Sequence, residues 1–350
     1  MSRIMYRYLI VIVSALLSAA CARESVRTYQ GSDHNILFVG RSLSTSDSLG
    51  PRQWTAGSYF AFAFDGNECT VNILDEQIWD GNGFNYLELV VDGVNTRVCI
   101  DSTFNALVLD SLLSDAPSHE VLVCKDTESS HGYIQLHSVI TKNLRPTAML
   151  SECSPLIEYI GNSITCGAEA YCDEVPYGTG RWGDRHRAYL AYGPRVSRML
   201  GARWMLTSVS GIGLIHSCCD MDIVMPQVYD KISLRDNKYE YSFSEPADIV
   251  CICLGQNDGV QDSTEFCSAY VDFISKVRSH NPSARIVMLS SPMADENLRA
   301  WQEKMLLSIE ANADSVEHFF FSKQWNSGGG DHPDYNEHAA IANELYNYLK

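Results

Sequence analysis

The chain has 350 residues, of which 45% are hydrophobic and 20% are charged, and its formal net charge is -17 at pH 7. This length is enough for two domains, and the ordinary apolar content predicts a well-packed globular protein. The acidic balance argues against a nucleic-acid binder, because contacts with phosphates need clustered Lys and Arg.

The first 21 residues have the pattern of a secretory signal. Arg3 and Arg7 precede the apolar run Tyr8–Leu17, and small residues follow up to Cys21. Such a segment is typical of a cleaved leader and too short to span a membrane. Cys21 also stands where a bacterial lipoprotein carries its lipidated cysteine, so lipidation and simple cleavage both stay open. We expect an exported bacterial protein that is periplasmic, tethered to the cell surface through Cys21, or secreted.

The cysteines predict no metal site. The sequence has 12 cysteines, so 11 remain beyond Cys21, an odd number that leaves at least one without a partner in the chain. Paired C-x-x-C units and spaced histidines, which would indicate zinc, are missing from the sequence. Cys166 and Cys172 are close enough in sequence to form a small loop disulfide, and we expect no cofactor.

Residues 30–146 read as an accessory domain of short strands. Ser58–Phe64 and Cys69–Leu74 alternate in polarity or size around an expected turn at Asp65-Gly66-Asn67. Asp92-Gly93 is a strong hairpin signal between two further apolar runs. About eight short strands without helical periodicity predict a β-sandwich, jelly-roll-like in type.

Residues 143–155 look like a linker, and residues 153–350 change to alternating strands and helices. Such alternation predicts a three-layer α/β domain with a parallel sheet, whose reacting groups lie at the carboxyl ends of the strands. The expected strands are Pro155–Ile160, Arg203–Thr207, Asp248–Leu254, Arg285–Leu289 and His318–Phe321, and the expected helices are Arg185–Leu200, Glu265–His280, Asn297–Ala311 and Tyr335–Leu349.

Polar residues that suit acyl transfer follow several of these strands. Ser163 comes directly after the first strand, where a serine is either a nucleophile or simply a capping residue in a strand-end turn. Later segments supply Gly211, Asn257 and, before the last helix, His332. A serine, a histidine and amide donors are the groups that an ester hydrolase needs, so together they favour a nucleophile at Ser163.

These four blocks resemble those of the SGNH (GDSL-like) hydrolases. With the preceding sandwich, which includes Trp54–Tyr59 and Cys124–Glu128, the chain resembles the two-domain family 2 carbohydrate esterases, which remove acetyl groups from plant polysaccharides such as xylan and glucomannan. The resemblance implies Ser163 as nucleophile and His332 as base. It also implies an oxyanion hole made by the backbone N–H groups of Ser163 and Gly211 and the side-chain amide of Asn257. Its implied partner is an acetylated polysaccharide or oligosaccharide.

Two positions depart from the family pattern. Asn162 stands where these hydrolases usually have Asp before the nucleophile, and we read it as a structural substitution. Gly329 stands where many of them have Asp three residues before the histidine. The imidazole of His332 is then oriented by a backbone carbonyl, which gives a Ser–His dyad, or by a remote carboxylate. We favour the dyad, because Asp331 adjoins His332 and neighbouring side chains usually point apart.

Other polar and aromatic residues have less direct roles. We expect Asp258 to brace the Asn257 loop. Asp331 occupies the place of an aromatic sugar platform in the family, so Trp325 and Trp182 are the candidates for stacking on sugar, with packing under a loop as the alternative. His338 and His216, which are other histidines of the domain, are expected to be structural.

Two other functions stay open from the sequence. A lipase or thioesterase of the same superfamily would need an apolar cleft or lid, and no long apolar loop lies near the motifs. A carbohydrate-binding surface protein that keeps a catalytically impaired hydrolase scaffold would also fit Asn162 and the missing Asp.

Overall fold

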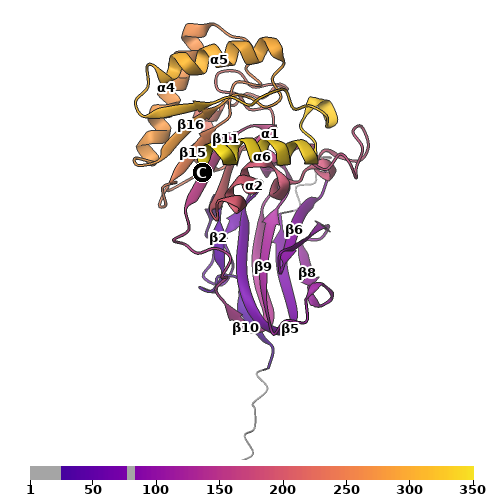
Figure 1. The fold of residues 1–350 in the computed structure, drawn as a ribbon. Coiled ribbons are helices and arrows are strands. Elements are labelled where there is room, and N and C mark those ends of the chain that lie inside the picture. The colour runs from indigo at the N-terminus through magenta and orange to yellow at the C-terminus, as the bar shows by residue number, and fades with distance from the viewer. Residues whose placement is uncertain (1–24, 77–82) are drawn as a thin grey trace, which may run out of the picture.

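The computed structural model describes residues 25–76 and 83–350, which form an antiparallel β domain followed by an α/β domain (Figure 1). The predicted signal sequence and Cys21 lie outside the described residues. Among the helices of the described residues, none combines the length and the apolar character needed to cross a bilayer.

The N-terminal domain is a ten-stranded antiparallel sheet that is bent into two layers. Its strands are β1 (Arg27–Gln30), β2 (Leu37–Val39), β3 (Ser42–Leu43), β4 (Arg52–Gln53), β5 (Tyr59–Asp75), β6 (Asn85–Val91), β7 (Val94–Ile100), β8 (Phe104–Val108), β9 (Ser118–Lys125) and β10 (Ile134–Arg145). The predicted hairpin turn between β6 and β7 is confirmed, because Asp92 and Gly93 both have positive φ, of 51° and 82°, as a tight turn of this kind requires.

Strand β5 connects the two layers. Its first half pairs with β9 and its second half with β8, while β10 runs along most of its other edge. The turn predicted at residues 65–67 is wrong, because β5 continues through it. Gly66 takes a φ of +96° and the register against β10 shifts at this point, so the expected turn is a bulge that bends one long strand. Sequence alone could not distinguish a bulge from a turn here.

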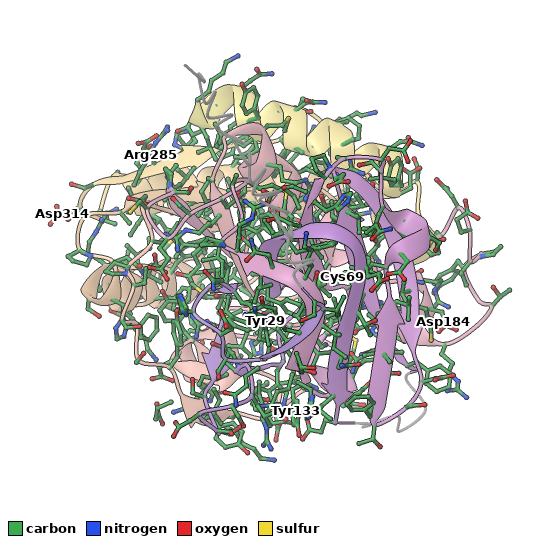
Figure 2. All side chains as sticks on the ribbon, turned by 90° about the horizontal axis from the view of Figure 1, so that it is seen from below. Tyr29, Cys69, Tyr133, Asp184, Arg285 and Asp314 are labelled. Atoms are coloured by element: carbon green, nitrogen blue, oxygen red, sulfur yellow. A yellow bond between two sulfur atoms is a disulfide. The ribbon has the colours of Figure 1, made fainter. Side chains whose placement is uncertain are left out.

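Alternate residues of the sandwich strands serve two different cores. Phe60 and Phe62 of β5 point into the interior of the sandwich, together with Val121 of β9. Tyr59 and Ala61, which alternate with them along β5, belong to the core of the α/β domain. Figure 2 views the packed side chains from below, with Cys69 among the strands of the sandwich. The predicted β-sandwich is thus confirmed, and one of its faces is covered by the second domain.

The second domain has a five-stranded parallel sheet in the order β12-β11-β15-β16-β17. Helices α4 and α5 cover one face of this sheet, and α2 and α6 lie on the side toward the sandwich (Figure 1). This arrangement confirms the predicted three-layer α/β fold. The elements are β11 (Leu156–Gly161), α1 (Ser163–Cys166), α2 (Tyr192–Met199), β12 (Arg203–Ser208), α3 (Met225–Val228), the hairpin β13 (Lys231–Ser233) and β14 (Lys238–Glu240), β15 (Ile249–Ile252), α4 (Ser263–His280), β16 (Arg285–Leu289), α5 (Glu296–Glu310), β17 (Val316–Phe319) and α6 (Tyr335–Leu349).

Most predicted elements lie within a few residues of their place, with one larger difference. The helix expected from Arg185 begins only at Tyr192. Pro194 is the reason, since proline has no N–H and is tolerated in the first turn of a helix but not in its interior. The chain before it forms two short 3-10 turns instead, Trp182–Arg185 and Ala188–Leu190.

The two domains share a buried polar interface. Arg41, from the sandwich, is fully buried and donates a hydrogen bond to Glu158 of β11 at 3.0 Å. The indole N–H of Trp204 donates to the carbonyl oxygen of Gly57 at 2.8 Å, and its ring lies 4.1 Å from that of Tyr59, centroid to centroid. Because the buried charge is paired and the aromatic rings are enclosed, we infer that the domains pack as one unit.

The predicted disulfide between Cys166 and Cys172 is wrong. Both thiols are free; Cys166 is buried within α1, and the Sγ of Cys172 contacts Oε2 of Glu169 at 2.9 Å. Adjacent Cys218 and Cys219 form a disulfide instead.

Candidate active site

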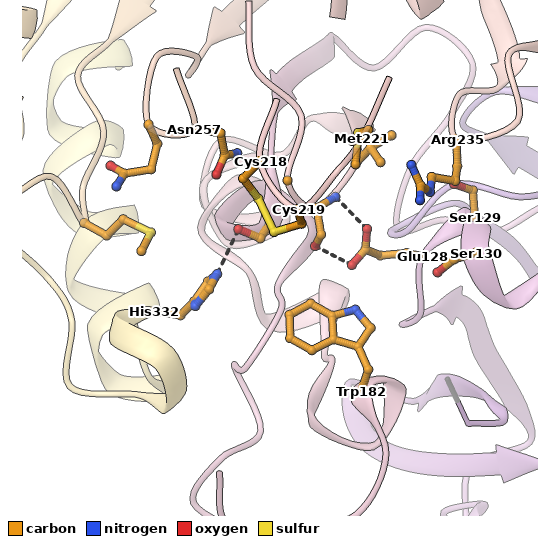
Figure 3. A pocket seen from close by; sticks show the side chains of 16 residues that line it. Glu128, Ser129, Ser130, Trp182, Cys218, Cys219, Met221, Arg235, Asn257 and His332 are labelled. Atoms are coloured by element: carbon orange, nitrogen blue, oxygen red, sulfur yellow. Dashed lines mark hydrogen bonds between the residues drawn. A yellow bond between two sulfur atoms is a disulfide. The ribbon is translucent and has the colours of Figure 1, made fainter. Parts of the chain in front are cut away.

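A cavity of about 390 Å³ opens where β11, β12 and β15 end (Figure 3). The strand β11 lies between its neighbours β12 and β15, so connections from the sheet leave in opposite directions at this edge, which is where open α/β sheets bind ligands. The cavity is lined by Glu128, Ser129, Ser130, Ser163, Trp182, Val209, Ser210, Gly211, Cys218, Cys219, Met221, Arg235, Gln256, Asn257, Met293 and His332.

Ser163 is the first residue of the short helix α1, and it is held by a tight turn. A Cβ at Gly161 would lie 2.1 Å from Oγ1 of Thr165, so only glycine fits directly before the turn. Asn162 caps the helix, because its Oδ1 accepts the backbone N–H of Ile164 at 3.2 Å. The amide of Asn162 therefore provides the local hydrogen bond that the turn needs, and Ser163 projects from the strand end with 7% of its surface exposed.

His332 lies beside Ser163, although 169 residues separate them in sequence. Its Nε2 is 2.8 Å from Oγ of Ser163. Its Nδ1 is 3.0 Å from the carbonyl oxygen of Gly330 and 3.2 Å from that of Gly329. Because carbonyl oxygens only accept, Nδ1 carries the hydrogen of the neutral ring and Nε2 is left to accept the serine proton. Burial lowers the pKa of His332, and the two carbonyls partly oppose this effect. The ring is thus prepared as a base.

The turn before Gly211 is held by a carboxylate from the other domain. Oε2 of Glu128 accepts the backbone N–H of Ser210 at 2.7 Å, and Oε1 accepts the Ser210 hydroxyl at 2.5 Å (Figure 3). Gly211 itself has a φ of +85°, which favours glycine. The cavity is therefore built from both domains, and Glu128 fixes one wall of it.

Buried side chains of His186 and Lys125 keep Glu128 in place. Nε2 of His186 lies 2.6 Å from Oε1 of Glu128, and Nδ1 of the same ring lies 2.9 Å from the carbonyl oxygen of Trp182. Both ring nitrogens of His186 therefore face acceptor oxygens. Burial would raise the pKa of Glu128, but its bonds with His186 and Ser210 outweigh this and lower it well below the usual range. Lys125, whose pKa is lowered to about 7 by burial, donates to the carbonyl oxygen of Glu128 at 2.7 Å.

Asn257 and Asp258 follow β15 and join two loops. Asn257 lines the cavity and donates one amide hydrogen to the carbonyl oxygen of Ile212 at 2.9 Å, which leaves its second amide hydrogen free for a ligand. The carboxylate of Asp258 accepts the backbone N–H groups of Leu214, Ile215 and His216 at 2.7–3.0 Å. Asp258 thus ties the Asn257 turn to the loop after Gly211 and does not point into the cavity.

The N-terminal domain matches a known family model. Residues 38–148 match the model described as carbohydrate esterase 2 N-terminal. The whole structure is similar to that of a family two carbohydrate esterase from Clostridium thermocellum in complex with cellohexaose, with a TM-score of 0.79 and 27% identity, over 90% of this chain and 98% of that one. The chain resembles the family 2 carbohydrate esterases over both of its domains.

Further relatives support the family 2 resemblance. Cellulase/esterase CelE of Acetivibrio thermocellus is 27% identical over 346 residues, which cover 93% of this chain, and the chain spans 40% of that relative's length. An acetyl xylan esterase from the rumen bacterium Butyrivibrio proteoclasticus shares the fold, with a TM-score of 0.79, 19% identity and coverage of 93% of this chain and 97% of that one. The SGNH-type fold and the family resemblance predicted from the four motifs are confirmed.

The family 2 resemblance leaves open what orients His332; among the described residues, Nδ1 contacts the carbonyl oxygens of Gly329 and Gly330. Within the part of the chain that the structure describes, no carboxylate forms a hydrogen bond with its ring. Asp331 is exposed and has a positive φ of 62°. Position 329 has no room for a side chain, because a Cβ there would lie 2.6 Å from Oε2 of Glu169 and 2.5 Å from the ring of Tyr177.

Glu169 was not found from the sequence. Its side chain is fully buried under the His332 loop, and Oε2 accepts a hydrogen bond from Nε of Arg185 at 2.7 Å. Its charge favours the protonated form of His332 and so opposes the effect of burial on the pKa of that ring. An acid in a loop of small residues carries no sequence signal of this role.

The two tryptophans proposed for sugar stacking lie in different places. Trp182 lines the cavity, below the disulfide in Figure 3. Trp325 does not line it; its ring is half-buried against the core and lies 4.0 Å under Nζ of Lys323. The structure therefore places Trp325 outside the cavity and packed against the core.

The remaining histidines lie outside the cavity. His338 is fully buried in α6, and burial lowers its pKa to about 3. The side chain of His216 is exposed, and its backbone belongs to the loop held by Asp258. Neither ring reaches the cavity lining. In the described ranges, no group of three His, Cys, Asp or Glu side chains is arranged to hold a metal ion.

The disulfide of Cys218 and Cys219 forms part of the cavity wall. The backbone N–H of Cys218 donates to the carbonyl oxygen of Gly211 at 2.8 Å. A Cβ at Gly211 would lie 3.1 Å from Sγ of Cys218, so the disulfide packs directly on the glycine. The two adjacent cysteines were the sequence signal for this disulfide. Neighbouring cysteines are rarely expected to pair, however, because the Cα atoms of a disulfide usually lie farther apart than those of adjacent residues.

Proposed function

We propose that this protein is a carbohydrate O-acetyl esterase that removes acetyl groups from plant polysaccharides of the xylan or glucomannan type. The observation that carries the proposal is the 2.8 Å contact between Oγ of Ser163 and Nε2 of His332, in a cavity also lined by Gly211 and Asn257. The names of similar proteins support it: one is an acetyl xylan esterase, and one was solved with bound cellohexaose.

The proposed reaction begins with Ser163. Its Oγ attacks the carbonyl carbon of the acetyl ester while His332 takes the serine proton on Nε2. The tetrahedral intermediate then expels the sugar hydroxyl, which receives that proton, and an acetyl-serine remains. Water attacks the acetyl-serine, with His332 again accepting a proton, and acetate leaves as Ser163 regains its hydrogen.

The negative oxygen of the intermediate would be held by three donors, namely the backbone N–H groups of Ser163 and Gly211 and the free amide hydrogen of Asn257. Loss of one such donor typically costs about 2.7–4 kcal/mol of transition-state stabilisation. The imidazolium formed during the reaction would be held by the carbonyl oxygens of Gly329 and Gly330 through Nδ1, which is a dyad mechanism without a carboxylate bound to the ring.

Assay of the purified protein tests the function. We expect acetate release from nitrophenyl acetate and from acetylated xylan or glucomannan, and loss of at least about a thousandfold in kcat for Ser163→Ala, as removal of a nucleophile produces. Full activity of Ser163→Ala would refute the mechanism. Preference for octanoate over acetate in a chain-length series would make the protein a lipase or thioesterase. Tight glycan binding without labelling of serine by a fluorophosphonate would make it a binding protein.

We also propose export through the leader at residues 1–21. The basic start, the apolar run and Cys21 are the support for this proposal. Metabolic labelling with palmitate, in the natural chain and in Cys21→Ser, distinguishes a lipid tether from simple cleavage.

A further inference from the structure

The cavity extends beyond what an acetyl group needs. Its volume of about 390 Å³ is within the range of sites that hold a whole small ligand, whereas an acetyl group has three heavy atoms. Ser163 and His332 take up one end, beside Asn257. Arg235, Ser129 and Ser130 lie at the other end (Figure 3). This second end is available to the part of the substrate that carries the ester.

Arg235 is the one unpaired charge among the side chains that line the described cavity. The only other ionisable groups are Glu128, whose oxygens are occupied by Ser210 and His186, and His332, whose pKa is lowered by burial. Arg235 is exposed, and no described residue forms a hydrogen bond or an ion pair with its guanidinium.

The backbone holds Arg235 at the rim. It lies in the turn of the β13–β14 hairpin, where the backbone N–H of Asn237 donates to the carbonyl oxygen of Leu234 at 3.1 Å. Leu234 is fully buried, so the turn is anchored directly beside Arg235. The acid next to it, Asp236, is occupied by the hydroxyl of Ser233 at 2.9 Å. The hairpin therefore presents the guanidinium without neutralising it.

Ser129 provides a second unused group at this end. It is 97% buried, it lines the cavity, and its hydroxyl has no hydrogen-bond partner among the described residues. A buried hydroxyl normally has a partner, because its burial without one costs free energy. A ligand with acceptor oxygens would satisfy Ser129 and Arg235 together.

We propose that the Arg235 end of the cavity is a subsite for the carboxylate of a uronic acid, so that the preferred substrate is an acetylated acidic polysaccharide or oligosaccharide. The proposal rests on the esterase function proposed above and names its substrate class. A planar guanidinium matches the two oxygens of a carboxylate, and a hydroxyl beside it adds a third donor. The contact acts at short range, since the charge of the rest of the protein is screened beyond about 8 Å at physiological salt.

Two acetylated xylo-oligosaccharides of equal length test the subsite, one neutral and one with a glucuronic acid next to the acetylated residue. The ratio of their kcat/KM values is measured for the natural chain, Arg235→Gln, Arg235→Lys and Lys238→Gln. Lys238 is a matched control because it is an exposed cation of the same hairpin and does not line the cavity. We expect the natural chain and Lys238→Gln to favour the acidic substrate by about tenfold, as a charge-assisted pair allows.

In Arg235→Gln the ratio of the two kcat/KM values should fall to about 1. In Arg235→Lys it should lie between this value and that of the natural chain, and 0.5 M NaCl should reduce the ratio of the natural chain. An equal ratio in the natural chain and Arg235→Gln would overturn the subsite. As a second measurement, a glucuronic acid oligosaccharide without acetyl groups should inhibit nitrophenyl acetate hydrolysis competitively, with a Ki raised about tenfold in Arg235→Gln; an unchanged Ki overturns the subsite too. If neither acetylated oligosaccharide is deacetylated, the esterase function fails instead.

Discussion

Replacement of Glu128 by Gln tests whether the sandwich domain shapes the catalytic wall. The carboxylate accepts three hydrogens, from the Ser210 N–H, the Ser210 hydroxyl and the Nε2–H of His186. An amide cannot replace it in either orientation. In one, its NH₂ meets the Ser210 N–H, so two donors face each other; in the other, its NH₂ replaces Oε1, the acceptor that Ser210 Oγ and Nε2 of His186 share. The Ser210-Gly211 turn then loses its fixed position.

The size of the effect follows from these contacts. A hydrogen bond to a charged group contributes about 1.5–3 kcal/mol, and a displacement of about 1 Å in a catalytic group costs about 10²-fold in rate. We therefore expect kcat on acetyl esters to fall by roughly 30- to 150-fold in Glu128→Gln, which corresponds to about 2–3 kcal/mol. KM should change little, because the ground-state ester does not depend on the oxyanion donors.

Glu120→Gln is the matched control for this variant. Glu120 also belongs to the sandwich and also accepts a hydroxyl and a backbone N–H, from Thr147 and Ala148, but at the linker and away from the cavity. Steady-state kinetics of both variants, with melting temperatures to confirm folding, decide the question. If Glu128→Gln keeps kcat within twofold of the natural chain, or if Glu120→Gln loses as much, the reasoning is wrong.

The remaining predictions concern stability, pH and sugar binding. The pKa of Glu128 is lower in the folded protein than in the unfolded chain. The Glu128 carboxylate therefore stabilises the fold fully above the unfolded pKa of about 4.3, and this stabilisation is lost as the pH falls from there through the lower folded pKa. The melting temperatures of the natural chain and Glu128→Gln should accordingly converge at low pH. Since burial lowers the pKa of His332, the acidic limb of kcat/KM should lie below about 6.5; a limb at pH 7 or above would contradict the buried neutral ring. Gly329→Asp should lower the free energy of unfolding by about 1–3 kcal/mol, because the new side chain overlaps Glu169. Adding Glu169→Ala to this variant should restore part of that stability, which melting curves of both variants measure. Trp182→Ala should raise KM for acetylated oligosaccharides about 2- to 12-fold, whereas Trp325→Ala should not, and equal effects of the two would remove Trp182 from the sugar site.

The sequence was sufficient where structure depends on local pattern. The Asp92-Gly93 hairpin, the parallel sheet and the last helix follow from neighbouring residues, and the structure agrees with them. Local pattern also misled twice. At Gly66 the same residue types serve a bulge and a turn, and before Tyr192 the apolar spacing of a helix was outweighed by Pro194.

Within the site, the sequence indicated the residues that stand in recognisable motifs, but not the buried acids that support the loops carrying those residues. The motifs indicated Ser163 and His332 because each stands in a recognisable turn. Glu128 reaches Ser210 across 82 residues and a domain boundary, and Glu169 acts from under the His332 loop. Such contacts depend on how the domains pack, and no periodicity or spacing in one chain reveals them.

Side chains alternate along β5, with Phe60 facing the core of the sandwich and Tyr59 facing the core of the α/β domain, so the two domains are inseparable in evolution and in engineering. The sandwich cannot be removed or exchanged as an appendage, since its outer face would be left as exposed apolar surface and the catalytic turn would lose Glu128. Heating should give one calorimetric transition for residues 25–350, not two. Cutting the chain between the domains would therefore yield two insoluble halves. A fusion of this enzyme to another protein has to include both domains.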